Sequence, residues 1–209
     1  MDASAATNAG AGRPLAAVES LSRFRSREET TAYIGMVVFL ASWGMLFASL
    51  FFSYGLVRAH ATDWPPLDQP RLPLLLPGIN TAVALGASLA LDRSVRALRG
   101  GRRWQGALGL AMATLLGTCF LALQAVVWTS LWSAGLHVDG GPYPSAFYAL
   151  TGLHAAHVLV GLLALAVLTL RVLGGGLARG RVTAVRLWAM YWHFVGIVWL
   201  LLYVTVYVL

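Results

Sequence analysis

Residues 146–170 read AFYALTGLHAAHVLVGLLALAVLTL and contain no Asp, Glu, Lys or Arg. At a rise of 1.5 Å per residue, a helix of this length extends about 37 Å, which exceeds the roughly 30 Å hydrocarbon core of a bilayer. That core holds no water for backbone amides and carbonyls, so an apolar stretch that crosses it folds as a helix. The stretch therefore predicts a transmembrane helix.

Four further apolar stretches are also long enough to cross a bilayer, and they lie at 32–57, 72–91, 107–128 and 187–208. Proline and glycine, which interrupt helices, gather in the connections between the stretches. The sequence as a whole is 58% hydrophobic and 11% charged, with a mean hydropathy of +0.71, which is atypical of a water-soluble globule. We therefore expect an all-α membrane protein, a bundle of five transmembrane helices.

Arginine is distributed unevenly between the two ends of the predicted helices. All fifteen basic residues are Arg, and only Arg58 and Arg71 fall outside the N-terminal tail, the second connection and the fourth connection. By the positive-inside rule, this bias predicts a cytoplasmic N-terminus and a periplasmic C-terminus. The net charge of +7 comes without a basic stripe interleaved with aromatic residues, so we expect no nucleic-acid partner.

The N-terminal tail differs from the rest of the chain in composition. It is rich in Ala, Gly, Ser and Thr without periodicity, a composition that buries too little apolar surface to order itself. We expect a disordered cytoplasmic tail over residues 1–25 and a membrane domain over residues 26–209. Ser26 and Glu29 fit a capping box, which predicts that the first helix starts at Ser26.

The acidic residues are all kept away from the predicted membrane core. All eight lie in the tail, in connections or at a helix end, so no predicted span holds a carboxylate. This argues against a self-contained proton pump or cation transporter, which needs such groups along its path. No phosphate-binding loop, Cys-x-x-Cys pair or Ser/His/Asp arrangement occurs either, so we expect no catalytic residue in this chain.

Three histidines lie in predicted spans: His154 and His157 on one face of the fourth helix, and His193 near the start of the fifth. One interpretation is a metal or haem site, because neutral imidazoles on facing helices ligate iron and copper. However, no carboxylate or Cys lies within a turn to complete a ligand shell. We therefore favour neutral histidines that hydrogen-bond across helices and fix the helix register. Their candidate partners are Gln124, Thr151 and Tyr191.

Small residues recur at four-residue spacing in the second and third spans. The two series are Gly78, Ala82, Gly86 and Ala90, and Gly109, Ala113 and Gly117. Such series let helix backbones approach closely in lipid, either inside one bundle or against a partner subunit. We favour packing inside the bundle, because these patterns are common in any helical membrane protein.

Particular strings of residues resemble subunit III of haem-copper oxidases, the cytochrome c oxidase subunit III family. They are YWHFVGIVWL at 191–200, FYALTGLHAAH at 147–157 and FLAS at 39–42. The resemblance extends over residues 33–209 and is to the shorter, five-helix bacterial form. It implies a non-catalytic subunit of a cytochrome c or quinol oxidase in aerobic respiratory electron transport, in the bacterial inner membrane.

The resemblance also implies partners and ligands. Haem and copper would lie in the partner catalytic subunits, and none in this chain. Oxidase subunit I would be the direct partner, with subunit II and further small subunits nearby. Family members hold phospholipids in a cleft between the first two helices of the seven-helix form and the remaining bundle, and they support proton uptake by subunit I. We expect six residues to be structural or interface positions: Gln124, His154, His157, Trp192, His193 and Trp199.

Three positions depart from the family pattern. The family usually has carboxylates where this chain has Trp43, Val127 and Gly196. Loss of all three together would dismantle a buried polar network and need leave no polar partner unpaired. Any proton role that depends on those acids is therefore in doubt, whereas scaffold and lipid-binding roles are not.

Two alternative functions stay open at this stage. The missing carboxylates are compatible with a related accessory subunit of a nitric oxide reductase, which belongs to the same superfamily. A stand-alone membrane transporter is less favoured, because only three histidines, Gln124, Asn80 and some hydroxyls are available to line a path.

Overall fold

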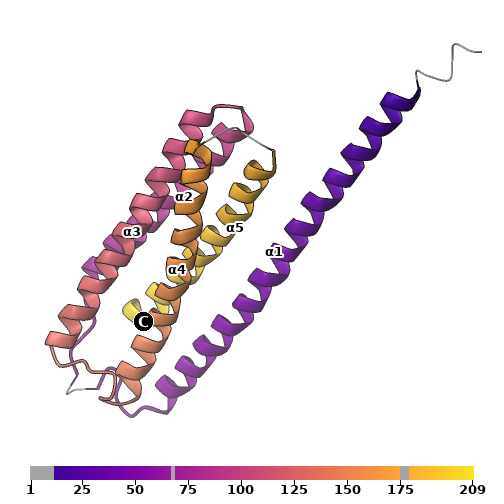
Figure 1. Ribbon diagram of the computed structural model, residues 1–209. Coiled ribbons are helices and arrows are strands. Elements are labelled where there is room, and N and C mark those ends of the chain that lie inside the picture. Colours follow the sequence, from indigo (N-terminus) through magenta and orange to yellow (C-terminus); the bar gives the residue numbers. More distant parts are fainter. Residues whose placement is uncertain (1–11, 67–68, 175–178) are drawn as a thin grey trace, which may run out of the picture. The chain divides into compact units, whose positions relative to one another are not determined.

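The computed structural model describes the backbone of residues 12–66, 69–174 and 179–209. It describes the side chains of residues 27–66, 69–174 and 182–209. All regular elements in these ranges are helical (Figure 1): α1 (Gly12–His60), α2 (Leu75–Arg99), α3 (Arg103–Ser133), α4 (Pro142–Gly174), α5 (Arg179–Leu202) and the π-helix η1 (Tyr203–Val208). Five helical stretches of this part of the chain are long and apolar enough to cross a membrane. The prediction of an all-α fold with five spans is confirmed.

The helices extend beyond most of the predicted span ends. The span predicted at 107–128 lies within α3, which runs Arg103–Ser133, and α2 continues eight residues past position 91, to Arg99. The apolar stretch marks only the hydrocarbon core, whereas a helix continues into the headgroup region, where arginine keeps its charge hydrated. The last predicted span, at 187–208, ends in the wider turns of η1, which the sequence did not indicate.

The start of α1 corrects the sequence prediction. The helix begins at Gly12 and passes through Ser26 without a break, so the start predicted at Ser26 is wrong. Residues 12–25 of the predicted tail are helical, and residues 1–11 lie outside the described residues. Once a helix is nucleated, each further residue adds a hydrogen bond, so an alanine-containing segment extends it without an apolar face of its own. The chain divides into two compact units, Met1–Ala41 and Ser42–Leu209, and α1 contributes to both.

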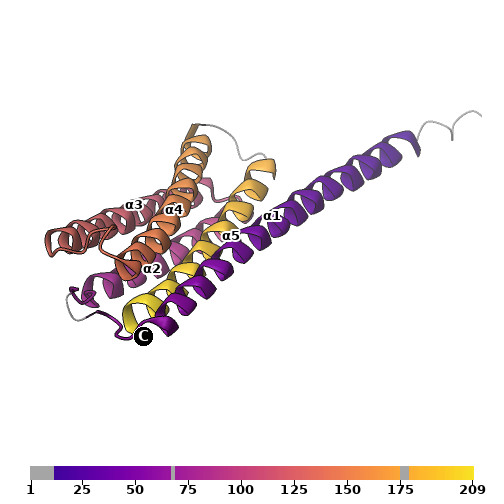
Figure 2. The ribbon, with the colours of Figure 1, turned by 90° about the horizontal axis from the view of Figure 1, so that it is seen from below.

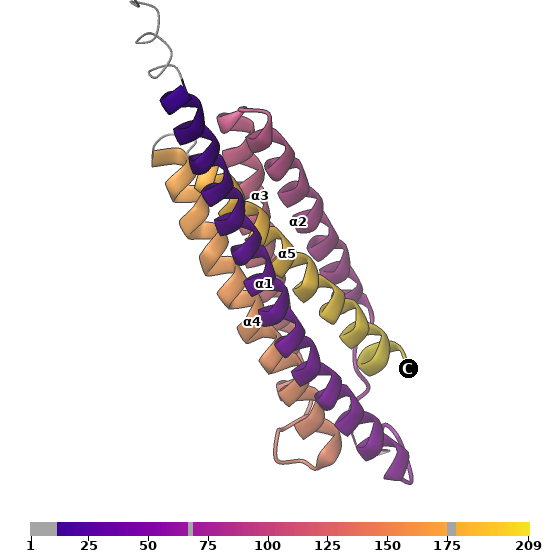
Figure 3. The same ribbon diagram turned by 90° about the vertical axis from the view of Figure 1, so that its right-hand side faces the viewer.

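Helices α2 to α5 form a closed ring within the second unit. α2 packs against α3 and α5, and α4 packs against the same two helices. Figures 2 and 3 show the four helices running alongside one another, each reversed relative to the one before it. Every neighbouring pair in the ring is therefore antiparallel, as in an up-down-up-down four-helix bundle.

The small residues of α3 pack against the other helices of this ring. A Cβ added to Gly109 would lie 2.7 Å from Ser94 Cβ on α2, and one added to Gly117 would lie 2.5 Å from Trp192 Cη2 on α5. These glycines are required because any side chain would collide with the neighbouring helix. For the series of α3, the prediction of packing inside the bundle is confirmed, whereas Ala82 in the series of α2 is exposed.

Hydrogen bonds to backbone carbonyls also join the helices of the ring. Ser94 Oγ donates to the carbonyl oxygen of Gly106 at 2.6 Å, and Asn80 Nδ2 donates to that of Phe120 at 3.2 Å. At the start of α3, Arg103 donates from Nε to the carbonyl oxygen of Val172 at 2.7 Å and from Nη2 to that of Leu173. The last carbonyls of α4, which have no partner within their own helix, are thereby satisfied.

Candidate functional site

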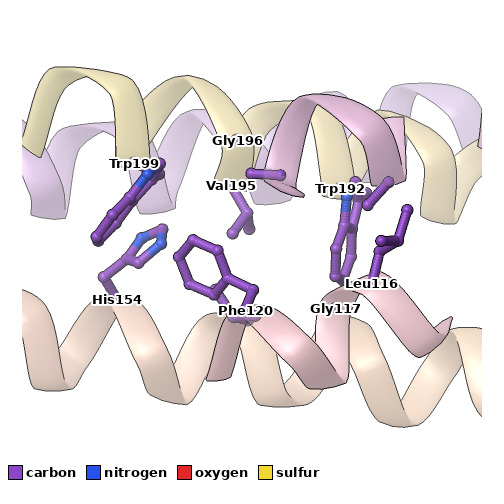
Figure 4. A pocket seen from close by; sticks show the side chains of 11 residues that line it. Leu116, Gly117, Phe120, His154, Trp192, Val195, Gly196 and Trp199 are labelled. Atoms are coloured by element: carbon purple, nitrogen blue, oxygen red, sulfur yellow. The ribbon is translucent and has the colours of Figure 1, made fainter. Parts of the chain in front are cut away.

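His154 lies on α4 at the centre of the ring, with 1% of its surface exposed. Aromatic rings from three other helices lie around its imidazole, and Figure 4 shows those of Phe120 and Trp199. The ring centroids of Trp199 on α5, Phe120 on α3 and Phe47 on α1 lie 5.5, 6.1 and 6.4 Å from that of His154. These rings separate the imidazole from lipid and from water.

The imidazole of His154 has no hydrogen-bond partner among the described residues, at either Nδ1 or Nε2. A neutral imidazole carries one donor and one acceptor, and each costs about 1–3 kcal/mol when it is buried unpaired. The predicted hydrogen bonds from His154 to another helix are therefore wrong. The sequence placed His154 on the same face of the fourth helix as His157. It did not show which side chains of the other helices would lie against that face.

His157, one turn along α4, makes one hydrogen bond within its own helix. Its Nδ1 lies 2.7 Å from the carbonyl oxygen of Leu153, and its Nε2 has no partner in the described part of the chain. The Tyr191 hydroxyl on α5 donates to the backbone carbonyl oxygen of His157 at 2.9 Å. The expected link between His157 and Tyr191 therefore exists, but it is made by the histidine backbone rather than by its ring.

Aromatic rings of α1 cover His157 from outside the ring of four helices. The centroid of Trp43 lies 4.0 Å from that of His157, with the planes at 81°, and the centroid of Phe47 lies 5.2 Å away. Phe47 is 2% exposed. The second half of α1 thus contacts α4 at the histidine pair.

An apolar pocket lies beside His154, between α3, α4 and α5, with α2 at its edge. Figure 4 shows Phe120, Trp192, Gly196 and Trp199 around it. A Cβ added to Gly196 would have Ser88 Oγ, at 3.9 Å, as its nearest neighbour, so this position has room for a side chain.

Two of the three positions that lack the family carboxylates adjoin the histidine pair. Trp43 packs on His157, and Gly196 lines the same pocket as His154. Val127 is fully buried, with 0% of its surface exposed. Three imidazole nitrogens of the histidine pair have no hydrogen-bond partner among the described residues, so Trp43 and Gly196 adjoin unpaired polar atoms.

Trp199 and Trp192 fix α5 against two of its neighbours. Trp199 Nε1 donates to Thr81 Oγ1 on α2 at 3.0 Å, and Trp199 is 1% exposed. Trp192 is 5% exposed and fills the space above Gly117 on α3. Both tryptophans lie in structural positions. Their partners, Thr81 and Gly117, were not predicted from the sequence to be site residues.

Gln124 is 1% exposed and connects α3 to the end of the chain. Its Nε2 donates to the Tyr207 hydroxyl at 3.4 Å, whereas its Oε1 has no partner within the described ranges. The predicted bond from Gln124 to a histidine is therefore wrong. Tyr207 lies in η1, and its position among the last residues gave no sequence signal that it points inward.

His193 is separate from the histidine pair. It lies on α5, with 36% of its side chain exposed, and its Nε2 is 3.0 Å from Oδ1 of Asp92 on α2. The sequence has no carboxylate within a helical turn of His193, but the fold brings one to it from another helix. The reason is that α2 continues past the apolar stretch, so that Asp92 lies inside a helix and faces α5.

In the ranges with described side chains, no three His, Cys, Asp or Glu residues lie close enough together to hold a metal ion. His154 and His157 therefore offer two imidazoles, fewer than the three protein ligands of a catalytic zinc site.

Comparisons with known proteins agree on one family. A sequence model described as "Cytochrome c oxidase subunit III" matches residues 25–209. The chain is 35% identical over 181 residues to "Cytochrome c oxidase subunit 3" of Synechocystis sp., which covers 84% of this chain and 74% of the relative. It is 34% identical over 180 residues to "Probable cytochrome c oxidase subunit 3" of Nocardia farcinica, covering 83% and 86%. The protein of Cyprinus carpio is 34% identical over 179 residues, covering 83% and 67%.

Proposed function

Because this chain belongs to the cytochrome c oxidase subunit III family, we propose that it is the supporting subunit of its oxidase, binding no haem or copper and stabilising the catalytic subunit. As subunit III of a haem-copper oxidase it takes part in aerobic respiratory electron transport. The matches give no support to the alternative of a nitric oxide reductase. A stand-alone transporter is disfavoured by the same matches.

The observation that carries the supporting role is the closed environment of the histidine pair. His154 is enclosed by aromatic rings, and the adjoining positions Trp43 and Gly196 hold no carboxylate. A proton or electron carrier needs ionisable groups or ligands in series, and among the described side chains no third His, Cys, Asp or Glu joins the two histidines. A role in packing requires only what is there: bulky rings, glycines that allow close approach, and hydrogen bonds between helices.

We propose oxidase subunit I as the direct partner, with subunit II and further small subunits in the same complex, in a bacterial inner membrane. The support is family membership together with five apolar helices. Purification in mild detergent through a tag on the N-terminal segment should recover a haem-containing partner. A colourless, monodisperse single chain that functions alone would contradict this proposal.

The cytoplasmic location of the N-terminus is supported by the thirteen arginines on one side of the predicted spans, against Arg58 and Arg71 on the other. Single cysteines placed in each connection of a variant that lacks Cys119 test it in intact cells. A membrane-impermeant thiol reagent should label the first connection, next to Arg58 and Arg71, and the third connection, and should spare the second and fourth. The reverse labelling would invert the proposed topology.

We further propose that phospholipid binding and support of proton uptake do not depend on carboxylates at positions 43, 127 and 196. We also propose that His157 has a structural role in assembly. The His157→Ala variant tests this role. It should reduce the amount of assembled complex while leaving the haem absorption spectrum of the remaining complex unchanged. A changed spectrum in a fully assembled complex would indicate a direct role for His157 near the haems.

A further inference from the structure

A second pocket lies at the end of the ring where α2 ends and α5 begins. Three arginines line it: Arg96 and Arg99 on α2 and Arg186 on α5. Asp92, His193 and three apolar side chains complete the lining. No residue of this pocket also lines the pocket beside His154. We call it the arginine pocket.

The one carboxylate of the arginine pocket is engaged by a histidine. Oδ1 of Asp92 lies 3.0 Å from Nε2 of His193, and Arg96 Nε donates to the backbone oxygen of Asp92, at 3.3 Å, rather than to its carboxylate. Arg96 and Arg99 alone therefore outnumber the one carboxylate of the lining, which His193 already engages, so the pocket carries excess positive charge. Such a pocket favours an anionic ligand.

The apolar part of the lining gives the pocket a second character. Val95 on α2 is 8% exposed and Ala189 on α5 is 5% exposed, and the part-buried side chain of Met190 lies beside them. Both helices cross the membrane, so this lining continues into their apolar faces. A ligand that suits both parts has an anionic group next to an apolar one.

We propose that the arginine pocket binds the phosphodiester group of an anionic membrane phospholipid, whose acyl chains lie along α2 and α5. Guanidinium groups bind phosphate oxygens through paired, charge-assisted hydrogen bonds, and basic pockets between transmembrane helices hold lipid headgroups. An inorganic phosphate ion shares the phosphate chemistry but makes no use of Val95, Ala189 and Met190. The lipid cleft that the family resemblance implies adjoins the first two helices of the seven-helix form, whereas this pocket lies between α2 and α5 of the remaining bundle, so the two are distinct.

The test uses the purified oxidase complex, stripped of loosely bound lipid and titrated with phosphatidylglycerol or phosphatidylcholine under native mass spectrometry. Four variants replace Arg96, Arg99 and Arg186 by Gln, each alone and all three together. The matched control is Arg93→Gln, an exposed arginine of α2 that does not line the pocket. At about 1 kcal/mol per arginine near a phosphate, each single variant should weaken phosphatidylglycerol binding about fivefold and the triple variant about 100-fold. The control should bind as the unmodified complex does.

Three results would overturn the proposal. The first is unchanged phosphatidylglycerol binding in the single and triple variants. The second is equal binding of phosphatidylcholine, which would remove the requirement for an anionic headgroup. The third is complete displacement of the lipid by millimolar inorganic phosphate, which would identify a soluble anion as the ligand. If the triple variant fails to assemble, the comparison of Arg99→Gln with the charge-preserving Arg99→Lys tests the proposal. Arg99→Gln should weaken lipid binding, whereas Arg99→Lys should keep it.

Discussion

Trp43 on α1 stands edge-on to His157 on α4, with their ring centroids 4.0 Å apart. The family resemblance leads us to expect a carboxylate at the position of Trp43, and this chain has an aromatic contact there instead. Aromatic pairs of this geometry contribute about 0.5–1.5 kcal/mol beyond their buried area. The second half of α1 is held to the ring of α2–α5 by this contact and its neighbours.

Phe47→Ala should separate α1 from α4 most effectively, because Phe47 is 2% exposed and contacts both His154 and His157. Truncation of a buried Phe costs about 3–5 kcal/mol. The loss of stability is measured by thermal unfolding of the purified complex, with release of this subunit as the signal. Met45→Ala, at a side chain that is 77% exposed, is the control and should change little. Equal effects of the two substitutions would contradict the proposed contact.

Gly117→Ala should destabilise the ring, because its Cβ would lie 2.5 Å from Trp192 Cη2 and 3.1 Å from Leu162 Cδ1. Overpacking of this kind costs about 1–3 kcal/mol. Gly86→Ala is the matched control, since its Cβ would meet only Leu116 Cδ1, at 3.5 Å. We expect Trp192→Phe to rescue the Gly117→Ala variant in the same unfolding assay. Without such rescue, the collision with Trp192 is not the cause.

Trp199 and Thr81 should show a measurable coupling energy. Their hydrogen bond of 3.0 Å joins α5 to α2 in a site where Trp199 is 1% exposed. A double-mutant cycle with Trp199→Phe and Thr81→Val should give about 0.5–1.5 kcal/mol, the net value of one hydrogen bond. Strictly additive effects would mean that the bond contributes nothing to stability.

His154→Phe should be tolerated better than His154→Ala. Both nitrogens of His154 lack partners among the described residues, so an apolar ring removes two unpaired polar groups while it keeps most of the volume. We expect a melting temperature equal to or above that of the unmodified complex, whereas His154→Ala leaves a cavity and lowers it. A His154→Phe variant that fails to assemble would reveal a polar partner supplied from outside this chain.

The spans and the bundle were predictable from the sequence because lipid imposes a simple rule. An apolar stretch without charges must form a helix, and its length nearly defines the element. The glycine series of α3 was predictable for the same reason, since close approach requires the absence of a side chain at Gly109 and Gly117. Helix ends were less predictable: α2 continues to Arg99 because arginine is compatible with the headgroup region.

The hydrogen-bond partners were not predictable, because they depend on which helices become neighbours. The pairing of Asp92 with His193 requires α2 beside α5, and a helix wheel for either one alone does not give that arrangement. Likewise, Tyr191 binds the backbone of His157 and leaves the imidazole unbonded at Nε2. Family membership identified where the carboxylates are missing, but only the packing showed that Trp43 and Gly196 adjoin the histidines.

The closure of the ring by α5 has a consequence for biogenesis. The ribosome completes α2, α3 and α4 before α5, yet α5 is the helix that packs against both α2 and α4. A nascent chain with only the earlier helices inserted presents Gly117 and Thr81 to lipid, without the tryptophans that later cover them. Maturation therefore passes through an intermediate in which the face of the ring that later binds α5 is uncovered. An insertion chaperone would bind this face at that stage.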